Sequence, residues 1–261
     1  MQNDDKIGPL IHKKADETNI QLANSLEDLV ADNNIIFSAV PASNTLEVFQ
    51  NIKNSLKPNT YYVDLTAATP DTKKQIESES KSLDVNYIDA ALMGPVPVYK
   101  HKVPMLISGN GAEKIHETFS DYEMDLTIVG ESAGNASAIK LIRSIYMKGL
   151  STLMIEMLSA AKKENVSDIV IKSIAETMNK TDFEGTMSRL VKGTAIHSGR
   201  RAGEMEGVIQ MLNDLNLNND MSLATQRTLQ NITDTNIRDY FVDKTPGSWH
   251  DVINYLNTNS K

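Results

Sequence analysis

The sequence predicts an α/β unit with a mostly parallel sheet, followed by an all-helical unit. Up to about residue 130, short β-branched and apolar runs alternate with amphipathic stretches, which is typical of strands joined by crossover helices. From residue 134 onward the strand-like runs disappear, and long stretches with apolar residues at helical spacing follow one another. We therefore predict two domains, over residues 1–130 and 131–261.

The first domain is expected to hold five strands with helices between most of them. The run Ile-Ile-Phe-Ser-Ala-Val at 35–40 is typical of a buried strand, and Pro70 suits the first turn of a helix, where its missing N–H is not needed. The predicted strands cover 35–40, 61–65, 86–92, 105–108 and 126–129, and the predicted helices cover 42–56, 70–83 and 112–122.

The second domain is expected to begin with a helix over residues 135–163, which contains no proline and only Gly149 as a weak point. Such a helix would be roughly 43 Å long. A small core cannot cover it alone, so we expect it to bridge two domains or the two copies of a homodimer. Further helices are predicted over 167–178, 183–192, 195–215, 222–231 and 248–257.

Composition excludes several classes of protein. The chain is 40% hydrophobic and 23% charged, as globular proteins are, and its net charge of −8 argues against nucleic acid as a partner. It has no cysteine and its five histidines lack ligand spacing, so we expect no disulfide and no metal site. No signal peptide opens the sequence and no run approaches ~18 apolar residues, so we expect a cytoplasmic protein that does not bind a membrane.

Residues 130–144 hold the most informative pattern. Small residues at the start of the predicted helix would let another backbone or a ligand approach closely. Lys140 follows among apolar residues such as Ile139 and Ile142, a setting that disfavours a charged amine and makes it usable as an acid or base near neutral pH. The alternative is an ordinary lysine whose apolar stem covers the helix surface while its amine reaches water.

This segment resembles the β-hydroxyacid dehydrogenases, which include 3-hydroxyisobutyrate dehydrogenase and the 6-phosphogluconate dehydrogenase-like proteins. Gly134-x-Ala136-x-x-x-Lys140, with Ser144 four residues later, matches the family's spacing of glycine-rich helix start, lysine and polar residue. Ala136 replaces the second glycine and Ser144 replaces the usual asparagine. The resemblance implies that Lys140 is the acid/base for a substrate hydroxyl, with Ser144 as a second catalytic-site residue.

Two further segments resemble the family's cofactor-binding loops. Residues 38–41 resemble the loop that lies along the dinucleotide, which implies that Val40 and Pro41 contact NAD or NADP. Residues 64–70 resemble the Ser/Thr-rich strand end before a helix that starts with proline, which implies a cofactor contact at Thr66.

Residues 89–97 resemble the family's substrate loop, which usually ends in Ser-Gly-Gly. The resemblance implies substrate contacts at Met93, Gly94 and Pro95. Met93 stands where the serine would be, and Pro95 replaces the second glycine. We therefore expect a small anionic hydroxy acid other than 3-hydroxyisobutyrate as the substrate.

Residues 197–205 resemble a branch of the 6-phosphogluconate dehydrogenase-like proteins in which a histidine and paired arginines open a C-terminal helix. His197, Arg200 and Arg201 could hold a carboxylate or phosphate through charge-assisted hydrogen bonds. A solvated, salt-bridged helix end is the alternative.

The family's Gly-x-Gly-x-x-Gly motif is not found in this sequence. Gly109-Asn110-Gly111 comes nearest but lacks the third glycine, and Asp4 or Asp5 is a candidate for the acidic residue that reads the ribose. The resemblance therefore implies an incomplete Rossmann-like domain in an NAD(P)-dependent oxidoreductase, with impaired cofactor binding by this chain alone. A non-catalytic dimerising remnant and a ligand-binding module are the alternatives.

Overall fold

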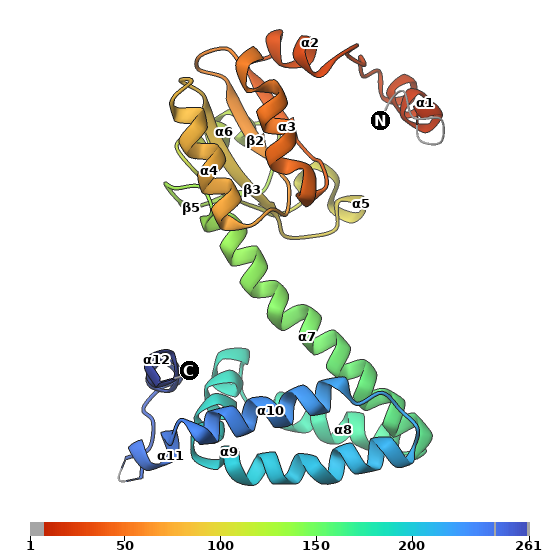
Figure 1. Cartoon of the computed structure of the whole chain (residues 1–261). Helices are drawn as coiled ribbons and strands as arrows, with labels where there is room; N and C mark the ends of the chain where they lie inside the picture. The colour runs from red at the N-terminus through yellow and green to blue at the C-terminus, as the bar shows by residue number, and fades with distance from the viewer. Residues whose placement is uncertain (1–7, 243, 260–261) are drawn as a thin grey trace. The chain divides into compact units, whose positions relative to one another are not determined.

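The computed structural model describes residues 8–242 and 244–259 (Figure 1). Asp4 and Asp5, the candidates for reading the ribose, lie outside the described residues. The chain divides into two compact units after Ile145, inside a long helix, so Lys140 belongs to the first unit. The boundary predicted at 130/131 falls just before the same helix.

The first unit contains a five-stranded sheet in the order β1-β2-β3-β4-β5. Three pairings are parallel and β3–β4 is antiparallel, which confirms the predicted α/β class with a mostly parallel sheet. The strands are β1 (Ile35–Ser38), β2 (Tyr61–Asp64), β3 (Asn86–Leu92), β4 (Met105–Ser108) and β5 (Leu126–Gly130). The helices are α1 (Gly8–Thr18), α2 (Leu26–Ala31), η1 (Ala42–Asn44), α3 (Thr45–Ile52), η2 (Lys53–Ser55), α4 (Pro70–Lys81), α5 (Val96–Tyr99), η3 (Lys100–Lys102) and α6 (Ala112–Ser120).

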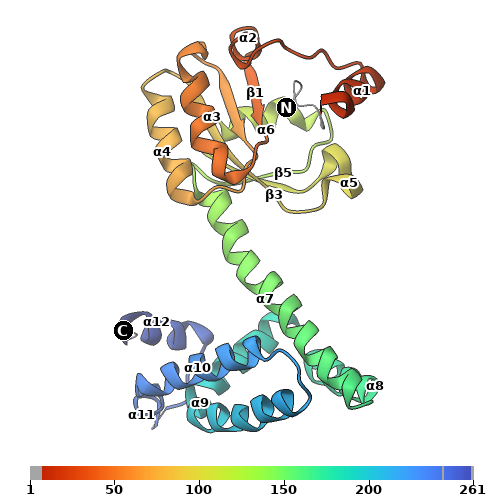
Figure 2. The ribbon, with the colours of Figure 1, turned by 45° about the vertical axis from the view of Figure 1, so that its right-hand side comes forward.

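Alternation along the strands sends side chains into two cores, one on each face of the sheet. Tyr62 and Tyr87 pack with residues of α3 and α4, such as Ile76, on one face. The next residues along β2 and β3, among them Ile88, pack with Ile115 of α6 on the other face. Figure 2 shows α3 and α4 together on one side of the sheet. The side chains of Asp64 and Asp89, two residues further along β2 and β3, lie on the same face as Tyr62 and Tyr87.

The second unit is helical, as predicted. Its helices are α7 (Asn135–Lys163), which begins in the first unit, α8 (Ser167–Met178), α9 (Phe183–Asp214), α10 (Asp220–Asp234), α11 (Ile237–Tyr240) and α12 (Trp249–Asn259). The two helices predicted over 183–192 and 195–215 are one helix, which is a correction. Gly193 weakens a helix by only about 1 kcal/mol relative to alanine, and α9 packs along α10, so tertiary contacts offset that cost.

A carboxylate from α7 holds the start of α10. Glu156 is buried and accepts hydrogen bonds from the backbone N–H groups of Met221 (3.0 Å) and Ser222 (2.9 Å) and from the Ser222 hydroxyl (2.6 Å). It thereby satisfies helix N–H groups that have no partner within α10.

Of the helices that the structure describes, none combines the length and the apolar character needed to cross a bilayer.

Candidate functional site

A row of polar residues crosses the sheet at one level. Strand register aligns Ser38 with Asp64, Asp64 with Asp89, Asp89 with Ser108, and Ser108 with Gly130. The four side chains of this row are buried, although each of the four strands is otherwise largely apolar. The row therefore places buried polar groups from four strands at one level of the sheet, where each needs a partner.

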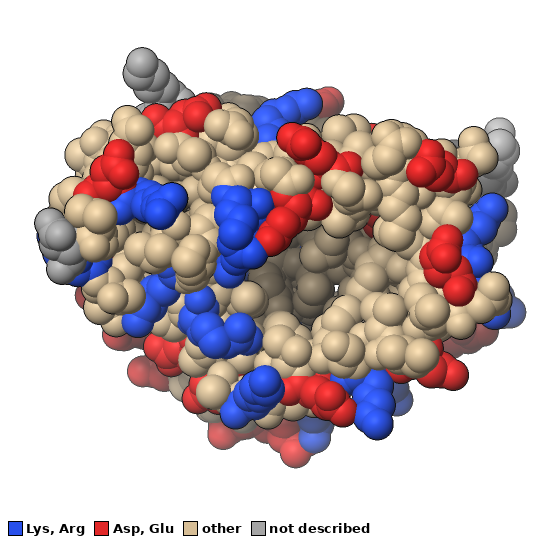
Figure 3. All heavy atoms as spheres, turned by 90° about the horizontal axis from the view of Figure 1, so that it is seen from below, with Lys and Arg blue, Asp and Glu red and all other residues tan. Residues whose placement is uncertain are grey.

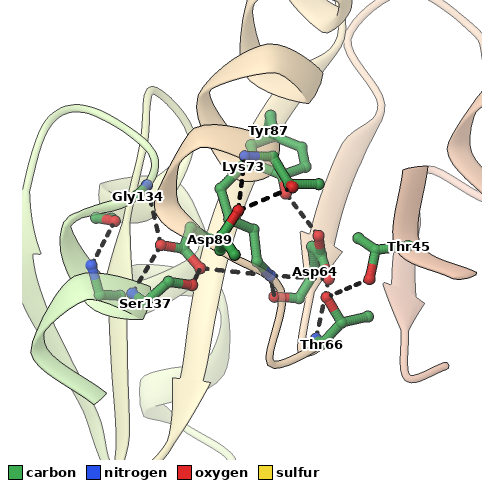
Figure 4. A network of polar contacts seen from close by, with 12 residues as sticks. Thr45, Asp64, Thr66, Lys73, Tyr87, Asp89, Gly134 and Ser137 are labelled. Atoms are coloured by element: carbon green, nitrogen blue, oxygen red, sulfur yellow. Dashed lines mark hydrogen bonds and ion pairs between the residues drawn. The ribbon is translucent and has the colours of Figure 1, made fainter. Parts of the chain in front are cut away.

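Lys73 of α4 links the two aspartates of this row. Its side chain is fully buried, and its Nζ lies 3.0 Å from Asp64 Oδ1, 3.0 Å from the Asp64 carbonyl oxygen and 3.4 Å from Asp89 Oδ1 (Figure 4). The Tyr87 hydroxyl donates to Asp64 Oδ2 at 2.6 Å, and the Thr66 N–H donates to Asp64 Oδ1 at 2.9 Å. One ammonium group thus serves two buried carboxylates, whose remaining lone pairs accept hydrogen bonds.

Asp89 also binds the start of α7. Its Oδ2 accepts from the N–H groups of Gly134 (3.0 Å) and Ser137 (2.9 Å), and its Oδ1 accepts from the Ser137 hydroxyl (2.6 Å) (Figure 4). Ser108 accepts from the Ala136 N–H at 3.1 Å. A negative charge at a helix N-terminus is favourable because the unpaired N–H groups carry partial positive charge.

Gly134 is needed for the close approach of α7 to α4. Its φ is +95°, and a Cβ there would lie 3.0 Å from the carbonyl oxygen of Pro70. Both facts favour glycine over any residue with a side chain. The glycine-rich helix start found in the sequence is therefore a packing requirement between two of the predicted functional segments.

Lys140 lies in the first two turns of α7 and is half-buried, as is Ser144 four residues later. The apolar surroundings predicted for Lys140 are not supplied by its sequence neighbours, which is a correction. Ile139 is 40% exposed and Ile142 is 66% exposed, because they point away from the core of the first unit. Ser137, Lys140 and Ser144 share one face of α7. The exposure of their side chains increases along this face, from Ser137, which is buried against Asp89, to the half-buried Lys140 and Ser144.

The predicted cofactor residues differ in how accessible they are. Val40 is half-buried and Pro41 is exposed, so they offer an apolar surface beyond β1. Thr66 is buried, its N–H donates to Asp64, and its hydroxyl accepts from Thr45 at 2.9 Å. Thr66 thus orders the loop after β2 and has little polar surface for a ligand.

Among the described residues, the N–H groups at the start of α7 are not open to the pyrophosphate of a dinucleotide. A pyrophosphate is usually held by the open N–H groups of a helix that starts at a glycine-rich turn. The sequence holds no Gly-x-Gly-x-x-Gly motif. The start of α7 is filled by side chains of the chain itself, Asp89 and Ser108.

The predicted substrate loop has an aromatic neighbour that the sequence did not indicate. Met93 is half-buried and donates its N–H to the Pro104 carbonyl at 2.7 Å, and Pro95 is exposed. The ring of Tyr99 lies over Gly94, 3.1 Å from where a Cβ would be. The loop therefore presents mainly apolar groups.

His197, Arg200 and Arg201 do not open a helix, which corrects the prediction. They lie well inside α9, so no helix N-terminus adds attraction for an anion. Arg200 is exposed and pairs with Glu204, as the salt-bridge alternative expects. Arg201 is half-buried and donates to the Thr194 hydroxyl at 2.6 Å.

In the part of the chain that the structure describes, no group of three or more acidic or histidine side chains could hold a metal ion.

Two tyrosines in the first core have altered acidity. Burial raises the pKa of Tyr62 to about 12. Burial, the charge of Asp64 and the hydrogen bond donated to that carboxylate hold the pKa of Tyr87 well above its usual value. Both tyrosines are therefore neutral at physiological pH.

Tyr62→Phe is expected to reduce the loss of stability at alkaline pH. The raised pKa means that Tyr62 contributes stability fully below about pH 10, its unfolded value, and that this contribution is lost as the pH rises towards 12. At about pH 11 the loss is about 1.4 kcal/mol. Urea unfolding at about pH 8 and pH 11 measures it, with exposed Tyr122→Phe as the control. Equal losses in wild type and Tyr62→Phe would contradict the assignment.

Sequence reasoning missed Lys73, Tyr87 and Ser108. The signal for Ser108 was present, because a polar residue ends an apolar strand there, as at Ser38 and Asp64. Helical spacing places Lys73 on the face of Ile76, three residues later, whereas Lys74 lies on another face. The packing of α4 on β3 shows that this face meets the sheet.

Comparisons with known protein families cover most of the chain. Residues 3–130 match the family described as the NAD binding domain of 6-phosphogluconate dehydrogenase, and residues 161–232 match a domain of unknown function. An uncharacterized 28.5 kDa protein of Methanothermus fervidus is 29% identical over 221 residues, which are 84% of each chain.

Several solved structures are also similar to this chain. A conserved hypothetical protein of Sinorhizobium meliloti is 26% identical, with a TM-score of 0.58 over 99% of this chain and 85% of that one. A conserved protein of unknown function, reported as structurally similar to 3-hydroxyacid dehydrogenases, is 27% identical, with a TM-score of 0.57 over 88% and 86%. An imine reductase of Myxococcus stipitatus in complex with NADP⁺ shares the fold, at 15% identity and a TM-score of 0.63 over 85% and 83%.

Proposed function

We propose that this chain, whose residues 3–130 match the NAD binding domain of 6-phosphogluconate dehydrogenase, is an NAD(P)-linked oxidoreductase acting on a small anionic hydroxy acid. Its family and fold are those of NAD(P)-binding hydroxyacid dehydrogenases and reductases. The observation that carries the proposal is the placement of Lys140. It lies in the first turns of a helix whose start is fixed by a buried network joining the segments that resemble the family's cofactor and substrate loops.

In the oxidative direction, Lys140 would accept the proton of the substrate hydroxyl as the C–H bond at the same carbon breaks. The chemistry that a nicotinamide cofactor supplies is acceptance or donation of a hydride at that carbon. In the reductive direction Lys140 would return the proton to the carbonyl oxygen. Ser144, one turn further along α7, would hydrogen-bond the same part of the substrate.

The proposed substrate carries an anionic group and an apolar group. Met93 and Pro95 offer apolar contacts, and the Gly94 backbone would face the substrate beside the ring of Tyr99. In the second unit taken by itself, we propose that His197 and Arg201 bind an anion. Arg200, which pairs with Glu204, would contribute long-range attraction.

The proposal is tested by turnover of a panel of 2- and 3-hydroxy acids. Each acid is offered with NAD⁺ or NADP⁺ at about 5 mM, because the site lacks a fitted pyrophosphate cradle, and reduced nicotinamide is followed by its absorbance. We expect turnover of at least one acid with an apolar substituent. The cofactor that supports it decides between NAD and NADP.

We also propose that the chain forms a homodimer through its helical unit. The apolar side chains of α8 are exposed, with Ile169 at 72% and Ile171 at 49%, and Ile155 of α7 is 64% exposed. An apolar cavity of 360 Å³ lies among α7, α8, α9 and α10. Figure 3 shows broad areas without charged side chains on the face seen from below. Apolar surface on this scale usually marks a protein interface.

Ile169→Asp is expected to convert the dimer to a monomer. A charge placed at the centre of an apolar interface has to be buried without a partner, which opposes association. Size exclusion with light scattering should give about twice 28.8 kDa for the wild type, and 28.8 kDa, the mass of one chain, for Ile169→Asp. Ala175→Asp, which places the same charge on α8 but six residues away and so on another side of the helix, is the control. A wild-type monomer at micromolar concentration would refute the proposal.

A further inference from the structure

The buried network connects segments that the sequence marked separately. Asp64 belongs to the segment before α4, Asp89 to the start of the substrate-loop segment, and Ser137 to the helix that carries Lys140. Lys73, Asp64 and Asp89 are 0% exposed and Ser137 is 3% exposed. Burying charged groups is costly unless each is paired and hydrogen-bonded, so such a network fixes one arrangement of the segments it joins.

Asp89 has the central place in this network. Its two oxygens accept from Gly134 N–H, Ser137 N–H and the Ser137 hydroxyl, and Lys73 lies 3.4 Å away as its counter-charge. Ser137 lies three residues before Lys140, and residues three apart share a face of a helix. The rotation of α7 about its axis at Ser137 therefore decides the direction in which Lys140 projects.

The same aspartate is tied to the substrate loop. Asp89 lies on β3, which ends at Leu92, immediately before Met93. Strand pairing with β2 and β4 fixes this stretch of backbone. A contact between Asp89 and Ser137 therefore sets the position of the Lys140 helix relative to the Met93–Pro95 loop.

We infer that Asp89, acting through the Ser137 hydroxyl, is the positioning residue that orients Lys140 relative to the substrate loop. The inference rests on the catalytic role proposed above for Lys140. Lys73 assists by neutralising Asp89 in the core. Gly134 assists by letting the first turn of α7 lie close enough to α4 for these bonds to form.

The test measures the Lys140 amine itself, without any turnover. Trace labelling with acetic anhydride, followed by peptide mass spectrometry, gives the rate of acylation at Lys140 relative to exposed Lys162 in the full chain. Ser137→Ala removes the hydroxyl bond but keeps the backbone N–H bond, so it is milder than any change at Asp89. Ser137→Thr restores a hydroxyl. Ser159→Ala is the control, since the hydroxyl of this α7 serine donates to the carbonyl of Ile155 in its own helix.

We expect Ser137→Ala to change the relative labelling rate of Lys140 by about threefold or more. Amide hydrogen exchange in the first turns of α7 should quicken roughly tenfold or more, the effect of losing one hydrogen bond to a charged group. Ser137→Thr should restore both values, and Ser159→Ala should leave both unchanged. Faster exchange or a lower Tm with an unchanged Lys140 rate would overturn the inference, because the bond would then be structural alone. Since no substrate enters the measurement, its result is independent of whether Lys140 catalyses turnover.

Discussion

Lys73→Met is expected to lower the free energy of unfolding by about 3–5 kcal/mol. Methionine keeps the length and the apolar stem of the side chain but removes the only charge that faces both Asp64 and Asp89 among the described residues. The two carboxylates, which are 0% exposed, would then have to remain buried without a counter-ion or become protonated. Either outcome costs folding free energy.

Urea unfolding at neutral pH measures this loss. Lys74→Met is the matched control, because Lys74 neighbours Lys73 in α4 and its ion pair with Asp71, at 3.9 Å, is solvent-exposed. A surface change of this kind should alter stability by about 0.5 kcal/mol or less. A loss below about 1 kcal/mol for Lys73→Met would show that the network does not depend on this lysine.

The purified chain is expected to bind NADH and NADPH with a dissociation constant in the millimolar range. Val40 and Pro41 offer an apolar flank, but no Gly-x-Gly-x-x-Gly turn is present for the pyrophosphate. The N–H groups at the start of α7 are already occupied by Asp89 and Ser108. Losing several charge-assisted hydrogen bonds at about 1.5–3 kcal/mol each moves a micromolar site to millimolar affinity or weaker.

Calorimetric titration with each reduced cofactor decides this question. The protein must be pure, because a partner chain that supplied a phosphate-binding turn could restore affinity. A dissociation constant of about 10 μM or tighter for either cofactor would contradict the account of the cofactor site.

Much of the fold could be predicted from the sequence where apolar runs lie between clear turn signals. The bounds predicted for β3, β4, α7 and α8 are those observed. The prediction of two helices in place of α9 was wrong. The sequence shows Gly193, which weakens a helix, but it does not show the packing of α9 on α10, which offsets that effect. The helices α1, α2, α5 and α11 were missed, and α2, α5 and α11 are too short to show a helical period.

The site could be predicted only in part, for a different physical reason. Motif spacing located Lys140 and the segments that meet near it, and their roles remain predictions. The contacts that join those segments depend on strand register and on which face of α4 meets the sheet. Lys73 and Lys74 are neighbours in sequence, yet one is fully buried between two aspartates and the other is exposed.

The central claim is that Lys140 is the acid/base of a hydroxy-acid oxidoreductase, and its most direct test is the turnover of Lys140→Ala. The substrate found in the panel is assayed at about 5 mM cofactor with the wild type, with Lys140→Ala and with Lys162→Ala, a control at the exposed far end of α7. General acid–base catalysis contributes about 10²–10⁴-fold, so kcat should fall by that factor in Lys140→Ala with Tm unchanged, while Lys162→Ala keeps the wild-type rate. Near-normal turnover by a folded Lys140→Ala variant, or no turnover of any acid by the wild type, would contradict the account.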